Sequence, residues 1–149
     1  MKKQLILYAL LLSVLSINAQ TIYQVNQLVG SKWMRSETEG DTLYIEFSSK
    51  DVIFSRIQKS IYAEPSYKTD SEKYYLSNII PLYFDYSKVG TKSSGKYIIF
   101  KNERVDGFIY EEIKLLAKDS MILYLDLNLA SDDMSYKEMM CYKKFKRVK

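Results

Sequence analysis

The sequence contains no histidine and a single cysteine, Cys141, and these two shortages exclude most familiar kinds of catalytic site. Without histidine, neither a Ser-His-Asp triad nor a Cys-His pair can be assembled. Histidine-based zinc sites are also excluded, and one cysteine cannot supply a thiolate site. The chain lacks the glycine-rich patterns of dinucleotide-binding and phosphate-binding loops. We therefore expect no enzyme activity, no metal and no cofactor.

The single cysteine also limits how the fold is stabilised. An intramolecular disulfide needs two cysteines, so the hydrophobic core must hold the domain together. Free cysteine often packs as a small apolar side chain. We therefore expect Cys141 to be buried.

The first twenty residues, MKKQLILYALLLSVLSINAQ, have the order of a targeting segment. Lys2 and Lys3 precede an apolar stretch, and the small residue Ala19 ends the segment. This order predicts a secretory signal peptide, residues 1–19, cleaved after Ala19. A retained anchor is the alternative, but the apolar stretch is shorter than the roughly 20 residues that cross a bilayer. We expect a secreted or periplasmic protein with one domain over 20–149 and no stable membrane span after cleavage.

The charge of the chain gives little reason to expect a nucleic acid partner. The formal net charge is +4. Lys2 and Lys3 contribute two of these charges and the leader contains no acid, so the mature chain carries about +2. A nearly balanced domain lacks the basic surface that phosphate backbones require.

A short helix is expected at the start of the mature chain. Apolar residues recur at helical spacing across 22–29, and Gly30 is a natural stop. The run Thr21–Gln24 fits a capping box that starts this helix.

From Trp33 onward the apolar pattern changes to a period of two. In TLYIEFSS, Leu43, Ile45 and Phe47 share one face, as a half-buried strand requires. Further strands are predicted within the ranges 51–58, 72–78, 81–84, 95–102, 107–119, 120–128 and 135–149. No helical segments of about 10–15 residues separate them, which disfavours parallel βαβ units. The predicted fold is all-β, an antiparallel up-and-down meander that closes into a barrel of about eight strands.

Four segments carry a resemblance to a known group of proteins. They are "LVGSKWMRS" (28–36), "YYLS" (74–77), "FDYSKVG" leading to "GKYIIF" (84–100), and "YKKFKRVK" (142–149). With these segments the chain resembles the lipocalins and the wider calycin group, and in particular the small exported lipocalin-like proteins of Gram-negative bacteria. Two residues separate Gly30 from Trp33 where the lipocalin signature has one, which favours the wider group over the classical family.

The resemblance implies a lipocalin-like barrel with a structural signature of Gly30, Trp33 and Arg147. In lipocalins the tryptophan closes the base of the barrel and a late arginine packs across its ring. Trp33 matches the first role. Arg147 is the best candidate for the second role, and Arg104 is less well placed for it. The resemblance also implies that the cavity binds a small, largely apolar ligand without catalysis.

Aromatic residues make an amphipathic cavity plausible, since fourteen tyrosines accompany six phenylalanines. A tyrosine can line a cavity or form an aromatic pair between strands. Which residues line the cavity depends on strand register, because a slip of one residue moves a strand's side chains to the other face. The mid-strand candidates for the lining are Ile45, Phe47, Phe54, Tyr97, Ile99, Tyr110, Leu123 and Leu125.

Two other interpretations compete with the ligand carrier. A barrel filled by its own side chains would instead be a protein-interaction or inhibitor module of the cell envelope, and cavity volume separates these cases. An outer-membrane barrel is disfavoured because Glu46, Arg56, Lys101 and Glu112 interrupt the apolar strands. Adjacent residues of a strand point to opposite faces, so Glu111 and Glu112 cannot form a catalytic carboxylate pair.

Overall fold

The computed structural model describes residues 21–37, 40–59, 63–102, 107–127 and 141–149. The predicted signal peptide, 1–19, lies outside these residues, so its cleavage and the export of the chain stay predictions.

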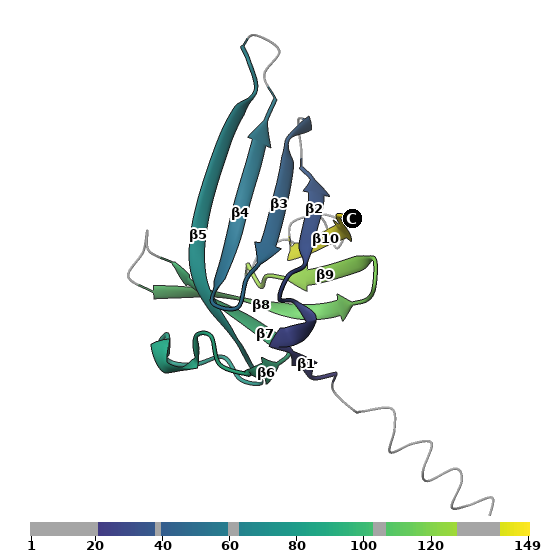
Figure 1. Ribbon diagram of the computed structural model, residues 1–149. Coiled ribbons are helices and arrows are strands. Elements are labelled where there is room, and N and C mark those ends of the chain that lie inside the picture. The colour runs from purple at the N-terminus through teal and green to yellow at the C-terminus, as the bar shows by residue number, and fades with distance from the viewer. Residues whose placement is uncertain (1–20, 38–39, 60–62, 103–106, 128–140) are drawn as a thin grey trace, which may run out of the picture.

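Eight antiparallel strands form a closed barrel in the order β10-β2-β3-β4-β5-β7-β8-β9 (Figure 1). Their bounds are β2 Lys32–Ser36, β3 Thr42–Phe47, β4 Asp51–Gln58, β5 Ser66–Ser77, β7 Tyr97–Asn102, β8 Gly107–Leu116, β9 Ser120–Tyr124 and β10 Tyr142–Arg147. Apart from the β10–β2 contact that closes the barrel, each strand pairs with its neighbours in chain order. The prediction of an all-β antiparallel barrel of about eight strands is confirmed.

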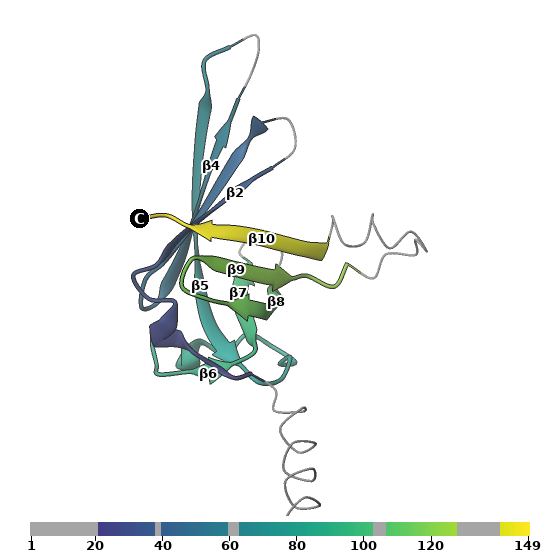
Figure 2. The ribbon, with the colours of Figure 1, turned by 90° about the vertical axis from the view of Figure 1, so that its right-hand side faces the viewer.

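The barrel wall consists of two halves that share strand β5. Its residues 66–73 pair with β4, whereas residues 74–77 pair with β7. On the other side, β10 pairs with β9 over residues 142–146, whereas its pairing with β2 is confined to its end, at Lys146 and Arg147 and at the Val148 N–H that donates to the Lys32 carbonyl. We call β2 to β5 the first wall and β7 to β10 the second wall. Figure 2 shows the two walls diverging from each other.

The closed end of the barrel is covered by the N-terminal segment. Strand β1 (Tyr23–Gln24) pairs with β6 (Ser94–Gly95) in a separate two-stranded sheet. The range 22–29, where one or two helical turns are expected, contains β1 and then the single 3-10 turn η2 (Val25–Gln27). Gly30 then reverses the chain with φ of +76°, and its N–H donates to the Phe47 carbonyl at 2.8 Å. A positive φ favours glycine because it has no Cβ.

Trp33 lies at this closed end and is only 1% exposed. Its indole N–H donates to Ser31 Oγ at 2.7 Å, and the Ser31 hydroxyl donates to the Leu28 carbonyl. The Arg147 guanidinium lies 5.6 Å from the centroid of the tryptophan ring. Trp33 therefore joins the N-terminal segment to strand β2 and to the last strand of the barrel.

The lower part of the barrel interior is a packed core. Phe47 and Tyr74 contact each other edge to face with ring centroids 5.3 Å apart. The Tyr74 hydroxyl donates to the Ser48 carbonyl at 2.8 Å, which satisfies its polar atom within the core. The buried residues of this cluster are Tyr23, Leu28, Trp33, Ile45, Phe47, Val52, Tyr74, Leu76, Ile98, Phe100, Ile113, Met121, Leu123 and Phe145.

Burial of Tyr74 makes the stability of the barrel sensitive to alkaline pH. Desolvation, together with the nearby Asp51 carboxylate, raises the pKa of Tyr74 to about 12. The pKa of Tyr74 in the folded protein exceeds the unfolded value of about 10. The contribution of its neutral side chain to stability is therefore complete below pH 10 and is lost between about pH 10 and 12. We expect the free energy of unfolding to fall by up to about 2 kcal/mol over that interval.

Urea unfolding at pH 8, 10 and 11.5 measures this loss. The matched variant Tyr74→Phe keeps the ring and removes the ionisable group, so it should lose less stability than the wild type. Equal losses in the two proteins would contradict an effect of Tyr74.

One strand prediction is wrong at the β5–β6 connection. Residues 81–84 form no strand, because Pro81 and Leu82 belong to an exposed loop that leads into the 3-10 turn η4 (Tyr86–Lys88). The strand predicted at 72–78 is confirmed as the second half of β5, which begins six residues earlier, at Ser66. Its first half is polar on both faces, and pairing with β4 holds it extended.

Candidate functional site

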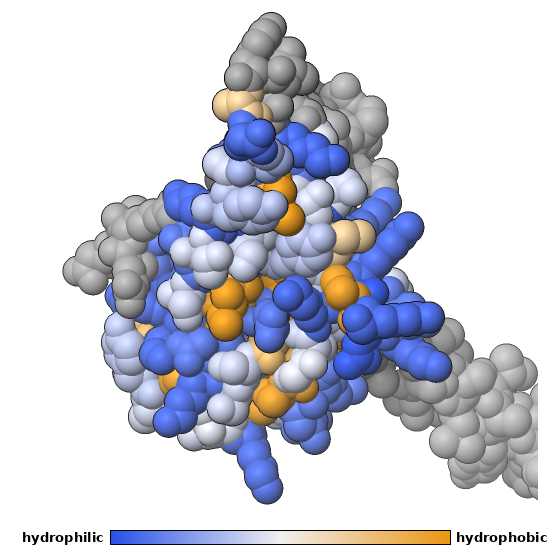
Figure 3. Space-filling model, turned by 45° about the horizontal axis from the view of Figure 1, so that its top comes forward, coloured by the Kyte–Doolittle hydropathy of each residue, from blue (hydrophilic) through white to orange (hydrophobic). Residues whose placement is uncertain are grey.

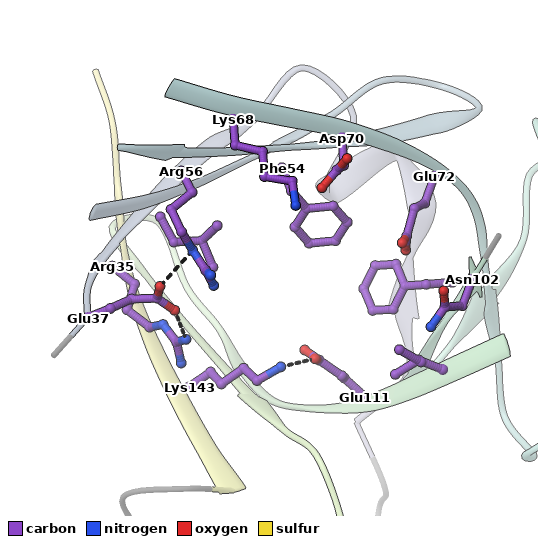
Figure 4. Close-up of a pocket in the computed structure, with 13 residues that line it drawn as sticks. Arg35, Glu37, Phe54, Arg56, Lys68, Asp70, Glu72, Asn102, Glu111 and Lys143 are labelled. Atoms are coloured by element: carbon purple, nitrogen blue, oxygen red, sulfur yellow. Dashed lines mark hydrogen bonds and ion pairs between the residues drawn. The ribbon is translucent and has the colours of Figure 1, made fainter. Parts of the chain in front are cut away.

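A cavity of about 340 Å³ occupies the open end of the barrel, opposite Trp33. Viewed with that end tilted forward, the surface is mainly hydrophilic with separate hydrophobic patches (Figure 3). The cavity is lined by Arg35, Glu37, Leu43, Phe54, Arg56, Lys68, Asp70, Glu72, Phe100, Asn102, Ile109, Glu111 and Lys143 (Figure 4).

Alternation along the strands places these side chains in the cavity. On β5 the lining residues are Lys68, Asp70 and Glu72, two positions apart. On β4 they are Phe54 and Arg56. Side chains two residues apart in a strand share one face, so each strand contributes its inward set.

The apolar part of the lining continues the core. Phe54 and Phe100 contact each other edge to face with centroids 5.8 Å apart. Phe100 is 3% exposed, and Leu43 and Phe54 pack against the same cluster. The aromatic pair thus offers an apolar surface at the point where the core ends and the cavity begins.

On the first wall, Glu37 links two arginines at the edge of the cavity. Its carboxylate lies 2.5 Å from Arg35 Nη2 and 3.0 Å from Arg56 Nε. The Glu37 N–H donates to the Asp41 carbonyl at 2.8 Å, which fixes the backbone beside the carboxylate. Arg35 also lies 5.5 Å from the centroid of the Phe145 ring. Its Nε is buried and has no hydrogen-bond partner in the described part of the chain. Two arginines and one glutamate leave this group with one excess positive charge.

On the second wall, Lys143 forms an ion pair with Glu111. Glu111 is 6% exposed, and a carboxylate so poorly hydrated is tolerated because it has a cationic partner. The pair joins β10 to β8 across the inside of the barrel and lies at the edge of the cavity away from β5 (Figure 4).

The charged lining is balanced in total but uneven in its arrangement. Four cationic side chains, Arg35, Arg56, Lys68 and Lys143, face the cavity with four acidic ones, Glu37, Asp70, Glu72 and Glu111. Arg35, Arg56 and Lys143 lie on one side, whereas Asp70 and Glu72 lie on the opposite side (Figure 4). The cavity therefore combines an apolar floor with polar groups of both signs.

Among the residues predicted from the sequence to line the cavity, Phe54 is the one that does so. Ile45, Phe47 and Leu123 point inward but belong to the packed core below the cavity. Leu125 follows the end of β9, and its N–H donates to the Cys141 carbonyl at 3.0 Å. Cys141 itself is buried.

The remaining predicted lining residues, Tyr97, Ile99 and Tyr110, lie on the outer face. Ile98 and Phe100 belong to the core, so Ile99 between them points outward. The Tyr97 and Tyr110 rings contact each other on that face with centroids 6.0 Å apart. Sequence reasoning missed the charged lining, although the alternation of Lys68, Asp70 and Glu72 was a signal for it.

Two negative findings concern the described residues. They contain no group of three or more His, Cys, Asp or Glu side chains that could hold a metal ion. No helix among them has the length and apolar character needed to cross a membrane.

The chain matches no family model, no curated protein and no solved structure at a significant level.

Proposed function

We propose that this protein is an exported, lipocalin-like carrier that binds a small amphipathic ligand at the open end of its barrel. The observation that carries the proposal is the cavity of about 340 Å³ between the aromatic floor and the charged rim. Small-molecule sites typically measure about 300–1,000 Å³ and combine an apolar surface with a few polar groups. The cavity falls at the small end of that range.

The lining favours a more polar ligand than the largely apolar one expected from the sequence. An apolar ring or short chain would pack on Phe54 and Phe100, which contact each other beneath the opening. A polar group on the ligand would contact the arginines at Glu37 or the acidic side at Asp70. Because the charges of the lining balance, a ligand of low net charge fits best.

The proposed activity is binding without covalent chemistry. No histidine is present to act as a general base near neutral pH. The carboxylates of Glu37 and Glu111 are held in ion pairs, which fix their positions in the lining. Groups held in this way can orient a bound ligand.

A second candidate function is a protein-interaction module of the cell envelope. The observation that favours it is the filled lower part of the barrel, where buried side chains such as Phe47, Tyr74 and Leu123 occupy the interior. In that case the rim and its charged residues would contact a protein partner instead of enclosing a small molecule.

Titration with the fluorescent dye 1-anilinonaphthalene-8-sulfonate tests the carrier, because the dye joins apolar rings to one charged group. We expect saturable binding that Ile109→Trp weakens at least about tenfold, since the indole would fill the cavity. The matched control is Leu115→Trp, on the same strand but outside the lining. The two positions are similarly exposed, 36% and 39%.

Equal affinity in the two variants would place the dye elsewhere and contradict the proposal. Native mass spectrometry of protein purified from its own host complements the titration. An extra mass that is lost on denaturation would identify a carried ligand, whereas an unliganded mass would favour the interaction module.

A further inference from the structure

Four exposed apolar side chains lie close together in sequence in the connection between β5 and β6. Ile79, Ile80, Leu82 and Tyr83 are 71%, 44%, 97% and 74% exposed. We call these four residues the apolar tip. Soluble proteins commonly expose single apolar side chains, but adjacent ones that point into solvent mark a binding surface.

The loop next to the apolar tip is anchored, so the tip is held away from the barrel. Phe84 packs between two tyrosines, with ring centroids 5.2 Å from Tyr75 and 5.0 Å from Tyr86. The Asp85 N–H donates to the Tyr75 hydroxyl at 3.4 Å. The Asp85 carboxylate accepts hydrogen bonds from the N–H and hydroxyl of Ser87. With Phe84 anchored, the residues before it extend outward.

The apolar tip belongs to the closed end of the barrel and is separate from the cavity. Both ribbon views place β6 and its preceding loop at the end where the N-terminal segment enters (Figures 1 and 2). The Val25 N–H donates to the Ser93 carbonyl at 3.1 Å, which ties the connection to that segment. None of the residues in the tip lines the cavity.

Basic side chains accompany the apolar tip. Lys88 and Lys92 follow it in the same connection and are exposed. Lys50 lies against Gly90 of this connection, where an added Cβ would lie 2.9 Å from the lysine side chain. Asp85 is the one acid between residues 78 and 93, and Lys88 lies 3.7 Å from it. Three lysines and one aspartate leave this region with an excess of positive charge.

We propose that the apolar tip inserts into the surface of an anionic lipid bilayer and docks the closed end of the barrel on the membrane. A protruding tip with side chains such as Leu82 suits a bilayer, which accepts apolar groups without needing a complementary groove. Tyr83 and Tyr86 have the apolar ring and polar hydroxyl that favour the membrane interface. The lysines would contact anionic headgroups, and each basic residue near such a surface strengthens binding. The open end of the barrel would then face the water.

Vesicle flotation tests this proposal with the full chain and variants that carry the same N-terminal residues. The vesicles contain phosphatidylcholine alone or mixed with phosphatidylglycerol. We expect binding to the anionic vesicles, with a partition coefficient that Leu82→Asp lowers at least about tenfold. The matched control is Tyr67→Asp, which adds the same charge at another highly exposed apolar side chain, 76% exposed on β5. It should bind within about twofold of the wild type.

The fluorescence of a tryptophan introduced into the apolar tip tests whether the tip itself enters the bilayer. Leu82→Trp should show a blue-shifted fluorescence on anionic vesicles, against the constant signal of buried Trp33. The proposal is overturned if the wild type does not float with anionic vesicles, or if Leu82→Asp floats equally well. It is also overturned if Leu82→Asp converts a dimer to a monomer in light scattering while vesicle binding is unchanged, which would assign the tip to a second copy of the chain.

Discussion

Replacement of Trp33 by alanine is expected to lower the free energy of unfolding by about 3–5 kcal/mol, the usual cost of truncating a large buried aromatic side chain. Trp33 is 1% exposed and is among the largest fully buried side chains. Alanine removes the ring from the closed end and also leaves Ser31 Oγ without its indole donor. Arg147 loses the ring that it covers at 5.6 Å. The closed end thus loses packing, a hydrogen bond and a cation–π contact together.

Urea unfolding followed by far-ultraviolet circular dichroism measures this effect, because the variant has no tryptophan fluorescence. Trp33→Phe should fall between the wild type and the alanine variant, since it keeps an aromatic ring but not the N–H donor. Arg147→Lys should cost about 1 kcal/mol or less, the scale of an exposed cation–π contact. A loss below about 1 kcal/mol for Trp33→Ala would show that the barrel does not depend on this residue for closure.

Alanine at Gly95 is expected to disrupt the closed end by overlap with backbone atoms. A Cβ at this position would lie 2.1 Å from the Ser77 carbonyl carbon and 2.2 Å from its oxygen. Backbone atoms within β5 cannot move aside as the end of a flexible side chain can, so β6 itself must shift. Gly95 pairs with Tyr23, and the shift would separate β6 from β1 as well. We expect a loss of about 1–3 kcal/mol or more, the cost of overpacking a tight site.

Hydrogen exchange locates this damage by comparing amide protection in β1 and η2 with protection in the barrel strands. The matched control is Gly107→Ala at the start of β8, where an added Cβ meets nothing within 4 Å. It should change the unfolding free energy by about 0.5 kcal/mol or less. Similar losses for both substitutions would indicate a general effect of removing glycine and not a clash with Ser77.

The strands could be predicted where one face is apolar and the other polar. TLYIEF alternates in this way, and Ile45 and Phe47 enter the core as the pattern requires. YIIF in β7 is apolar at every position, so the pattern does not tell which residues face inward. The structure places Ile98 inward and Ile99 outward. Neighbouring segments cover both faces there, and their positions are not encoded in the local pattern.

The cavity was harder to predict because its lining is polar. Reasoning from the sequence assumes that apolar residues face the interior, which fails where a barrel opens to water. Lys68, Asp70 and Glu72 alternate along β5 and so mark one charged face, but the local sequence does not tell whether that face points into the barrel or to the solvent. In the sequence, Glu111 stands out only as a neighbour of Glu112. Its ion pair with Lys143, 32 residues away, depends on the closure of the barrel.

The narrow connections between the two walls have a consequence for how the cavity accommodates its contents. The strand pairing that joins the walls involves Tyr74–Ser77 on β5 and, on the other side, Lys146 and Arg147 of β10, followed by the Val148 N–H that donates to the Lys32 carbonyl. The ion pairs of Glu37 lie within the first wall, and the pair of Lys143 with Glu111 lies within the second. The walls also meet through the Phe54–Phe100 ring contact and the contact of Arg35 with Phe145, so a ligand that widened the cavity would have to separate this packing as well as the seams.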